Sequence, residues 1–280
     1  MTTQDYIERA VEVMRRGDRA TGGDMLERRD GVIDVAMADG LHSGGLPEEV
    51  RPIEVDPEKL VKSRVLVDHR CPALTAYKVL RTRLLRRMVQ NGWTTLGITS
   101  PREGEGKTLT TINLAISISM MRSEPVVLVD LDFHKPAVHR YFGFDVGQGV
   151  AGYLSGEQSD EVLAVKPGIE QLVIYPGSCR PERSSELLSS LRMGEFVSGL
   201  KGRYPRSLVL FDLPPMLIGD DVLAFSPYID TVLLVVEENS TTTDDLKKVA
   251  KQIRDLNMIG CVLNKASSFA DDGYEYGSYK

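Results

Sequence analysis

A glycine-rich loop between a buried strand and a long helix is the feature that most limits how this chain can fold. The loop is Gly104-Glu105-Gly106-Lys107-Thr108, which follows the apolar residues 95–99 and leads into the helical period of residues 107–121. Glycines let backbone N–H groups approach an anion closely, and the helix that follows adds the positive end of its dipole. This order of elements predicts a phosphate-binding loop after the first strand of an α/β sheet.

The residues of the loop have different roles in binding a nucleotide. Lys107 is expected to bring a positive charge to the β and γ phosphates of ATP, and the Thr108 hydroxyl to bind Mg²⁺. The predicted nucleotide contacts run from Gly104 to Leu109. The usual pattern begins with a glycine where this chain has Pro101, but strand, loop and helix follow one another as the pattern requires.

Apolar, β-branched runs alternate with helical periods along the rest of the chain. Strands are predicted at 94–99, 126–130, 171–175, 207–212, 231–236 and 260–264, and helices at 72–90, 107–121, 184–201 and 242–256. This alternation is typical of a mostly parallel sheet with helices on both faces. We therefore expect an α/β fold of the P-loop NTPase class.

Three aspartates follow predicted strands and are candidates for the same site. Asp130 and Asp132 are two residues apart, so in an extended segment both carboxylates point the same way. The alternative is that they cap a strand-to-helix turn. Asp212 ends a strand just before Pro214-Pro215, the usual place for a ligand of Mg²⁺ and its waters. The predicted catalytic residues are Lys107, Asp130 and Asp132, and the predicted metal ligands are Thr108, Asp130 and Asp212.

The composition is that of an ordinary globular protein, and it argues against a nucleic-acid-binding protein and against a membrane-spanning one. The formal net charge of −6 gives no sign of nucleic-acid binding. No run of about 18 apolar residues and no signal-peptide pattern is found, so we expect membrane association to come through a partner. Three scattered cysteines fit a reducing cytosol.

The sequence divides into three parts. Residues 1–65 are expected to form an N-terminal extension, with a short amphipathic helix at Tyr6–Arg16 and a flexible linker. Residues 66–267 form the nucleotide-binding domain, and residues 268–280 form a polar tail. Thirteen extended residues span at most about 45 Å, so the tail is able to reach its own site or a neighbour's. Its candidate phosphate acceptors are Tyr274, Tyr276 and Tyr279.

Three other features permit more than one interpretation. Arg102, inside the loop, faces either the phosphates or solvent. Asn264-Lys265, at the end of the last predicted strand, is a weak signal for contact with a nucleotide base. The helix at 72–90 has a basic face that is either solvated or part of an interface, formed by Lys78, Arg81, Arg83, Arg86 and Arg87.

Taken together, the motifs resemble those of the cytoplasmic bacterial tyrosine kinases (BY-kinases) of capsule and exopolysaccharide synthesis. The resemblance covers residues 72–280 and is carried by five segments, namely Thr99–Thr108, Val129–Pro136, Ser184–Ser190, Asp212–Pro215 and Val262–Lys265 with the tyrosine tail. It implies a stand-alone protein-tyrosine autokinase that uses ATP and Mg²⁺ to phosphorylate its tail tyrosines. A tyrosine hydroxyl has an ordinary pKa near ~10, so the reaction needs a proton acceptor, and we assign Asp132 to this role.

The resemblance also implies partners and a location. BY-kinases act with a membrane-bound polysaccharide co-polymerase that regulates chain length, and a cognate tyrosine phosphatase is expected. The chain would then lie in the cytoplasm, at the inner face of the membrane. Members usually form a ring in which the subunits phosphorylate one another. The ring interface carries Glu, Arg and Arg at positions that are Thr75, Lys78 and Arg81 here. Because threonine has no carboxylate, we expect any homo-oligomer to use other contacts.

Two other functions fit the same motifs. In a partition- or positioning-type ATPase, water replaces tyrosine as the attacking group. Those relatives place a lysine early in the loop, and Arg102 is only a poor match for it. In a non-catalytic scaffold, ATP binding would regulate a polysaccharide machine without chemistry. The presence of Lys107, Asp130, Asp132 and Asp212 argues against a scaffold.

Overall fold

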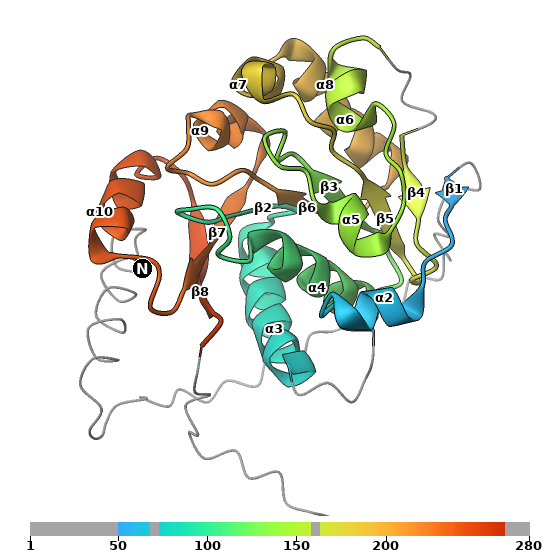
Figure 1. The fold of residues 1–280 in the computed structure, drawn as a ribbon, viewed down its shortest axis with the longest axis horizontal. Coiled ribbons are helices and arrows are strands. Elements are labelled where there is room, and N and C mark those ends of the chain that lie inside the picture. The colour runs from blue at the N-terminus through green and yellow to red at the C-terminus, as the bar shows by residue number, and fades with distance from the viewer. Residues whose placement is uncertain (1–49, 68–72, 158–162, 267–280) are drawn as a thin grey trace, which may run out of the picture.

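The computed structural model of the chain describes residues 50–67, 73–157 and 163–266. The predicted helix at Tyr6–Arg16 and the tyrosine tail at 268–280 lie outside these residues. The described part of the chain forms a central sheet with helices above and below it (Figure 1).

Eight strands form the sheet of the described residues, in the order β1-β4-β5-β3-β6-β2-β7-β8. They are β1 (Arg51–Pro52), β2 (Thr95–Thr99), β3 (Val126–Asp130), β4 (Val165–Lys166), β5 (Leu172–Tyr175), β6 (Leu208–Asp212), β7 (Thr231–Glu237) and β8 (Met258–Asn264). From β5 to β8 all neighbouring strands are parallel, and β4 is antiparallel to β5. The mostly parallel sheet is as predicted.

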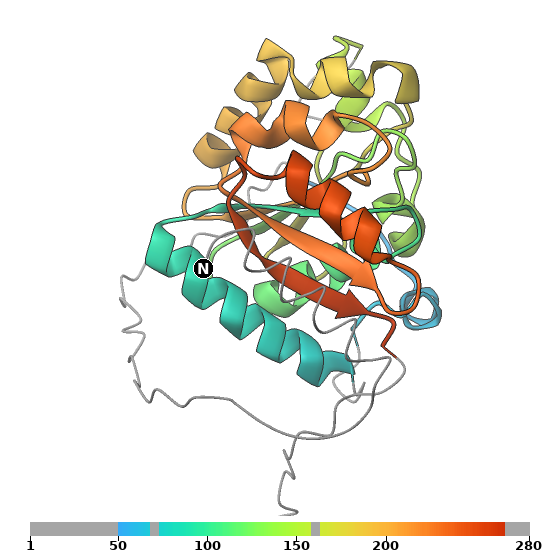
Figure 2. The same ribbon diagram turned by 90° about the vertical axis from the view of Figure 1, so that its left-hand side faces the viewer.

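Alternate residues of each central strand face two different cores. In β3, Val127 and Val129 belong to one core cluster, and Val126 and Leu128 belong to the other. Because helices cover both faces, the strands are apolar throughout instead of alternating with polar residues. The two layers of helices are seen edge-on in Figure 2. The predicted α/β fold with helices on both faces is confirmed.

Each layer combines long and short helices. One face is covered by α2 (Pro57–Lys62), α3 (Ala73–Asn91), α4 (Lys107–Ser119) and α5 (Val138–Phe142). The other is covered by α6 (Gly149–Leu154), α7 (Ser184–Leu188), α8 (Leu191–Arg203), α9 (Asp221–Phe225) and α10 (Thr243–Gln252). Val50 and Leu60, which precede residue 66, are buried in these same two clusters.

The single helix predicted at 184–201 is two helices, α7 and α8. Ser190 separates them with extended backbone (φ −69°, ψ 153°), and its Oγ accepts a hydrogen bond from the Met193 N–H. Serine side chains bond to nearby backbone groups and so favour helix ends over helix interiors. The hydrophobic period continues across this break, which explains why the periodicity alone did not reveal it.

The basic face of α3 is partly turned into the molecule. Arg81 is 8% exposed, and its Nη1 donates to the Ser117 carbonyl oxygen of α4 at 2.6 Å. Arg87 donates to the carbonyl oxygen of Ile259 in β8. The guanidinium groups therefore satisfy backbone carbonyls inside the domain, and Arg81 is not presented to a neighbouring molecule. Lys78, Arg83 and Arg86 are exposed.

Candidate active site

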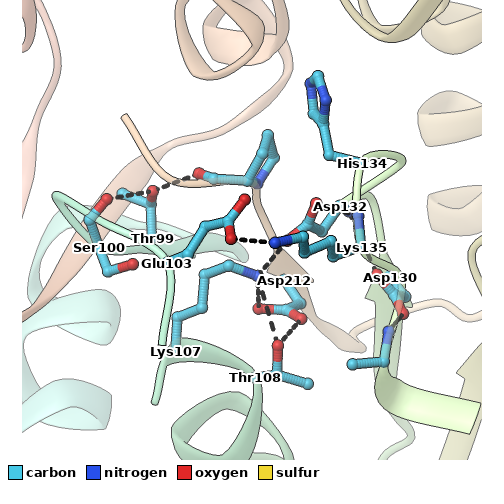
Figure 3. A network of polar contacts seen from close by, with 12 residues as sticks. Thr99, Ser100, Glu103, Lys107, Thr108, Asp130, Asp132, His134, Lys135 and Asp212 are labelled. Atoms are coloured by element: carbon cyan, nitrogen blue, oxygen red, sulfur yellow. Dashed lines mark hydrogen bonds and ion pairs between the residues drawn. The ribbon is translucent and has the colours of Figure 1, made fainter. Parts of the chain in front are cut away.

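Three neighbouring strands end together at the carboxyl edge of the sheet. β6 lies between β2 and β3, and Asp130 of β3 is directly opposite Asp212 of β6 in the register. The loop after β2 leads into α4, which begins with Lys107 and Thr108. The parallel topology therefore brings these four predicted site residues together, and Asp132 lies beside them (Figure 3).

The ammonium group of Lys107 lies between two carboxylates. Its Nζ is 2.7 Å from Asp132 Oδ2 and 3.4 Å from Asp212 Oδ1, and its side chain is 9% exposed. Burial alone would lower the pKa of Lys107, but the charges of Asp212 and Asp132 outweigh burial and raise that pKa. Lys107 is therefore a buried, charged group at the start of α4, where the helix dipole also favours an anion.

Thr108 and Asp212 are joined by a hydroxyl–carboxylate hydrogen bond. The Thr108 Oγ1 donates to Asp212 Oδ2 at 2.6 Å. Burial raises the pKa of Asp212, although Lys107 and the Thr108 hydroxyl favour its ionised form. A threonine hydroxyl beside a carboxylate at the start of this helix is a donor set that suits Mg²⁺.

Asp130 is fully buried and shapes the loop that carries Asp132. Its Oδ2 accepts the N–H groups of Ala137 and Val138, each at 3.0 Å, and its Oδ1 accepts that of Asp132 at 3.2 Å. Burial and the nearby charge of Asp212 raise the pKa of Asp130 to about 8, against the effect of Lys107. The predicted role of Asp130 at the metal stays a prediction, since these hydrogen bonds use both of its oxygens.

The end of β8 is hydrogen-bonded to the backbone of the phosphate-binding loop. The Asn264 Nδ2 donates to the Glu105 carbonyl oxygen at 2.8 Å, and the Lys265 Nζ donates to that of Gly104, also at 2.8 Å. Gly106 has a φ of +91°, and a Cβ built on it would lie 2.1 Å from Asn264 Nδ2. Asn264-Lys265 thus has a structural contact with the loop, and the base contact suggested by the sequence stays a prediction.

Alanine substitutions at the two loop glycines are expected to destabilise the fold to different extents. Gly104 also has a positive φ of +82°, but a Cβ there meets nothing within 4 Å. Both Gly104→Ala and Gly106→Ala are expected to cost about 1–2 kcal/mol for the left-handed backbone. Gly106→Ala should cost more, because Asn264 must leave the loop. Urea denaturation of both variants measures this difference, and equal losses would show that the Asn264 contact adds no stability.

Arg102 pairs with a residue of α10, and its side chain is 58% exposed. Its Nη2 is 2.9 Å from Asp245 Oδ1 at the start of α10, while its backbone N–H donates to Glu105 Oε2. Burial would raise the pKa of Asp245, but Arg102 and Thr242 lower it to about 2. The Arg102–Asp245 ion pair joins the phosphate loop to α10. Sequence pattern does not reveal this pair, because Asp245 is 143 positions from Arg102.

Two further pairs border the acidic loop. His134 Nε2 lies 3.2 Å from Asp221 Oδ2 of α9, so His134 is partnered within the domain. Lys135 contacts Glu103 of the phosphate loop. Asp221 was not singled out in the sequence, since a lone aspartate in a helical first turn reads as a helix cap.

The donor set fits Mg²⁺ bound together with a phosphorylated ligand. Within residues 50–67, 73–157 and 163–266, no group of three or more histidine, cysteine, aspartate or glutamate side chains is arranged to hold a metal ion by itself. Mg²⁺ is usually bound by one or two protein oxygens, phosphate oxygens and water. Thr108 and Asp212 provide the protein oxygens that such a site requires.

Similarity to known proteins agrees with this geometry. A family model described as the CobQ/CobB/MinD/ParA nucleotide binding domain matches residues 96–273. The chain belongs to this family. The match begins in β2 and includes the phosphate loop, α4, β3, β6 and β8, which are the elements that form the site. The CobQ/CobB/MinD/ParA assignment therefore makes this part of the chain a nucleotide-binding domain.

Several relatives of this chain are named as tyrosine kinases. The putative tyrosine-protein kinase EpsB of Ralstonia nicotianae is 31% identical over 208 residues, which are 74% of this chain and 27% of EpsB. The tyrosine-protein kinase YwqD of Bacillus subtilis is 28% identical over 206 residues, which are 72% of this chain and 85% of YwqD. The crystal structure of the VpsO kinase domain is 31% identical, with a TM-score of 0.61, and the match covers 69% of this chain and 96% of that domain.

These relatives confirm the resemblance to bacterial tyrosine kinases that the motifs indicated. The chain spans about a quarter of the length of EpsB but most of the length of YwqD. In the described ranges, none of the helices combines the length and the apolar character needed to cross a bilayer.

Proposed function

We propose that the chain is a protein-tyrosine kinase that transfers the γ-phosphoryl group of ATP to tyrosines of its own tail. Two relatives, EpsB and YwqD, are named tyrosine-protein kinases. The observation that carries the proposal is the 2.7 Å contact between Lys107 Nζ and Asp132 Oδ2. This contact supports a role for Asp132 as the proton acceptor. The Asp132 carboxylate lies beside the phosphate-binding ammonium group and, unlike that of Asp212, accepts no hydrogen bond from Thr108.

Each polar group has its own role in this proposal. Residues Gly104 to Leu109 hold the phosphates of ATP, and Lys107 neutralises the β and γ phosphates. Thr108 and Asp212 would hold Mg²⁺, whose positive charge would lower the pKa of the buried Asp130 and favour its ionised form. Mg²⁺, when bound, neutralises the charge on the phosphoryl oxygens.

In this reaction the ammonium group of Lys107 must leave its carboxylate partners and bind the phosphates of ATP. When its Nζ turns to ATP, Asp132 Oδ2 loses its cation and becomes an acceptor for the tyrosine hydroxyl proton. The tyrosine oxygen forms a bond to the γ-phosphorus as the bond from that phosphorus to the ADP oxygen breaks. Each product tyrosine carries about two additional negative charges, which repel the tail from a site rich in carboxylates.

Intact mass after incubation with Mg-ATP tests the proposal. The natural chain is expected to gain the mass of one to three phosphate groups, since the tail has three tyrosines. Replacing Tyr274, Tyr276 and Tyr279 together by phenylalanine should remove the gain. Phosphate that persists on the triple variant would place the acceptor elsewhere. ATP consumption without a gain in mass would favour the partition-type ATPase.

The partners and the location follow from the same proposal. A membrane-bound polysaccharide co-polymerase is the proposed activator, and a cognate tyrosine phosphatase is proposed to return the tail to its unmodified state. The chain would then act in the cytoplasm, at the inner face of the membrane, in exopolysaccharide or capsule synthesis and export. If the purified chain is inactive alone, adding the cytoplasmic segment of such a co-polymerase should start phosphorylation.

A further inference from the structure

A groove borders the phosphate-binding loop on the side of α10. Its volume is about 790 Å³, and it is lined by the loop, by residues 217–218 and by one face of α10. Leu217 and Ile218, which is 44% exposed, give it an apolar surface. Lys248 and Lys251 line it from α10, which lies across β7 and β8 (Figure 2).

The unpaired charge of this groove is positive. The carboxylates that line it already have cationic partners, in the contacts Asp245–Arg102 (2.9 Å) and Glu103–Lys135. Lys248 and Lys251 are exposed, and neither has an ion-pair partner within the described part of the chain. An apolar surface flanked by two such ammonium groups fits a peptide in which an aromatic ring lies between carboxylates.

One segment of this chain has that chemistry. Residues 271–276 read Asp-Asp-Gly-Tyr-Glu-Tyr, so carboxylates flank Tyr274 on both sides. The segment follows closely on Lys265, which is bonded to Gly104 of the loop at 2.8 Å. Asp272 is seven residues beyond Lys265, which extended backbone spans in at most about 25 Å.

We propose that the groove binds residues 271–276 of the same chain. The ring of Tyr274 packs on Leu217 and Ile218, and the flanking carboxylates meet Lys248 and Lys251. Exposed charge pairs are individually weak, but a tethered segment has an effective concentration in the millimolar range, so weak contacts suffice. The inference rests on the proposed kinase function for its purpose, which is to keep acceptor tyrosines beside the phosphate loop.

Exchanging the charges of the groove and the tail by substitution tests the contact through its effect on the rate of tail phosphorylation. Lys248→Glu with Lys251→Glu should slow tail phosphorylation roughly tenfold, and Asp271→Lys with Asp272→Lys should slow it similarly. Combining all four changes should restore most of the rate. Lys247→Glu is the matched control, since Lys247 is a neighbouring exposed lysine of α10 that does not line the groove. Four changes that slow the reaction further, or a control that slows it equally, would overturn the proposal.

Hydrogen exchange tests the contact without catalysis. In the absence of ATP, amides of α10 and of residues 217–218 are expected to exchange more slowly in the natural chain than in the Asp271→Lys, Asp272→Lys variant. The difference should shrink at high salt, because exposed charge pairs are screened. Equal exchange would overturn docking even if phosphorylation occurs, whereas slower exchange in a chain without kinase activity would support docking and reject only the kinase proposal.

A mixing experiment separates the chain's own tail from that of a second copy. The donor chain carries phenylalanine at 274, 276 and 279, and the acceptor is the Lys107→Met chain with its natural tail. If docking is within one chain, the acceptor should gain little phosphate, and the rate constant of the natural chain should not depend on its concentration. Acceptor phosphorylation at the natural rate would assign the groove to a second copy and overturn this proposal.

Discussion

Lys107→Met is expected to abolish tail phosphorylation and to destabilise the fold at alkaline pH. The activity loss should be at least about 10²–10³-fold, the usual effect of removing one group that stabilises charge in a transition state. The stability loss has a separate cause. Lys107 is the cation between Asp132 (2.7 Å) and Asp212 (3.4 Å), and breaking a buried ion pair by removing one partner costs about 3–5 kcal/mol.

The pH dependence follows from the direction of the carboxyl pKa shifts. Burial raises the pKa of Asp212, and burial with the charge of Asp212 raises that of Asp130 to about 8. A carboxyl whose folded pKa exceeds its unfolded value near ~4 stabilises the fold below that value, and this contribution is lost as pH rises through the folded pKa. Without Lys107 both pKa values rise further, so the fall in stability that begins at about pH 4 should continue to higher pH in the variant than in the natural chain.

Urea denaturation at pH 5 and pH 8 measures this effect. The difference between the natural chain and Lys107→Met should be small at pH 5 and large at pH 8. Lys62→Met, at an exposed lysine of α2 whose side chain is 80% exposed, should change stability little at either pH. A constant difference across pH would mean that lost packing, and not the unpaired carboxylates, destabilises the variant.

Local pattern was sufficient to predict the elements that carry the site. The strands before the loop, before Asp130 and before Asp212 are continuous apolar runs, because both faces of a parallel sheet are covered. Once those strands are parallel neighbours, their carboxyl ends meet at one edge, so the gathering of Lys107, Asp130 and Asp212 followed from order and topology. That inference needed no side-chain geometry.

Contacts between distant segments could not be predicted in this way. Arg102 pairs with Asp245, 143 positions away, and Arg81 turns inward to the Ser117 carbonyl oxygen of α4. Both depend on how two elements pack, which a helical period does not encode. The position of Lys107 between Asp132 and Asp212 is similar, since it reflects the balance of charges in a buried cluster and not a sequence spacing.

Asp132→Asn is expected to slow tail phosphorylation by about 10²–10⁴-fold while leaving ATP binding nearly unchanged. A positioned proton acceptor typically contributes a factor of this size, and asparagine keeps the shape of aspartate but is not a base. The contact that Asp132 makes with Lys107 competes with the phosphates for the same ammonium group. The variant should therefore bind a non-hydrolysable ATP analogue as tightly as the natural chain, or slightly more tightly.

Asp212→Asn is the matched control, because the same change of charge falls on the residue that accepts the Thr108 hydroxyl at 2.6 Å. If Asp212 serves the metal, its variant should need a higher Mg²⁺ concentration for half-maximal rate, whereas Asp132→Asn should keep the natural Mg²⁺ dependence. A shifted Mg²⁺ requirement in Asp132→Asn, with an unchanged one in Asp212→Asn, would exchange the two roles. The acidic loop would then hold the cation, and the tyrosine proton would have to leave toward β6.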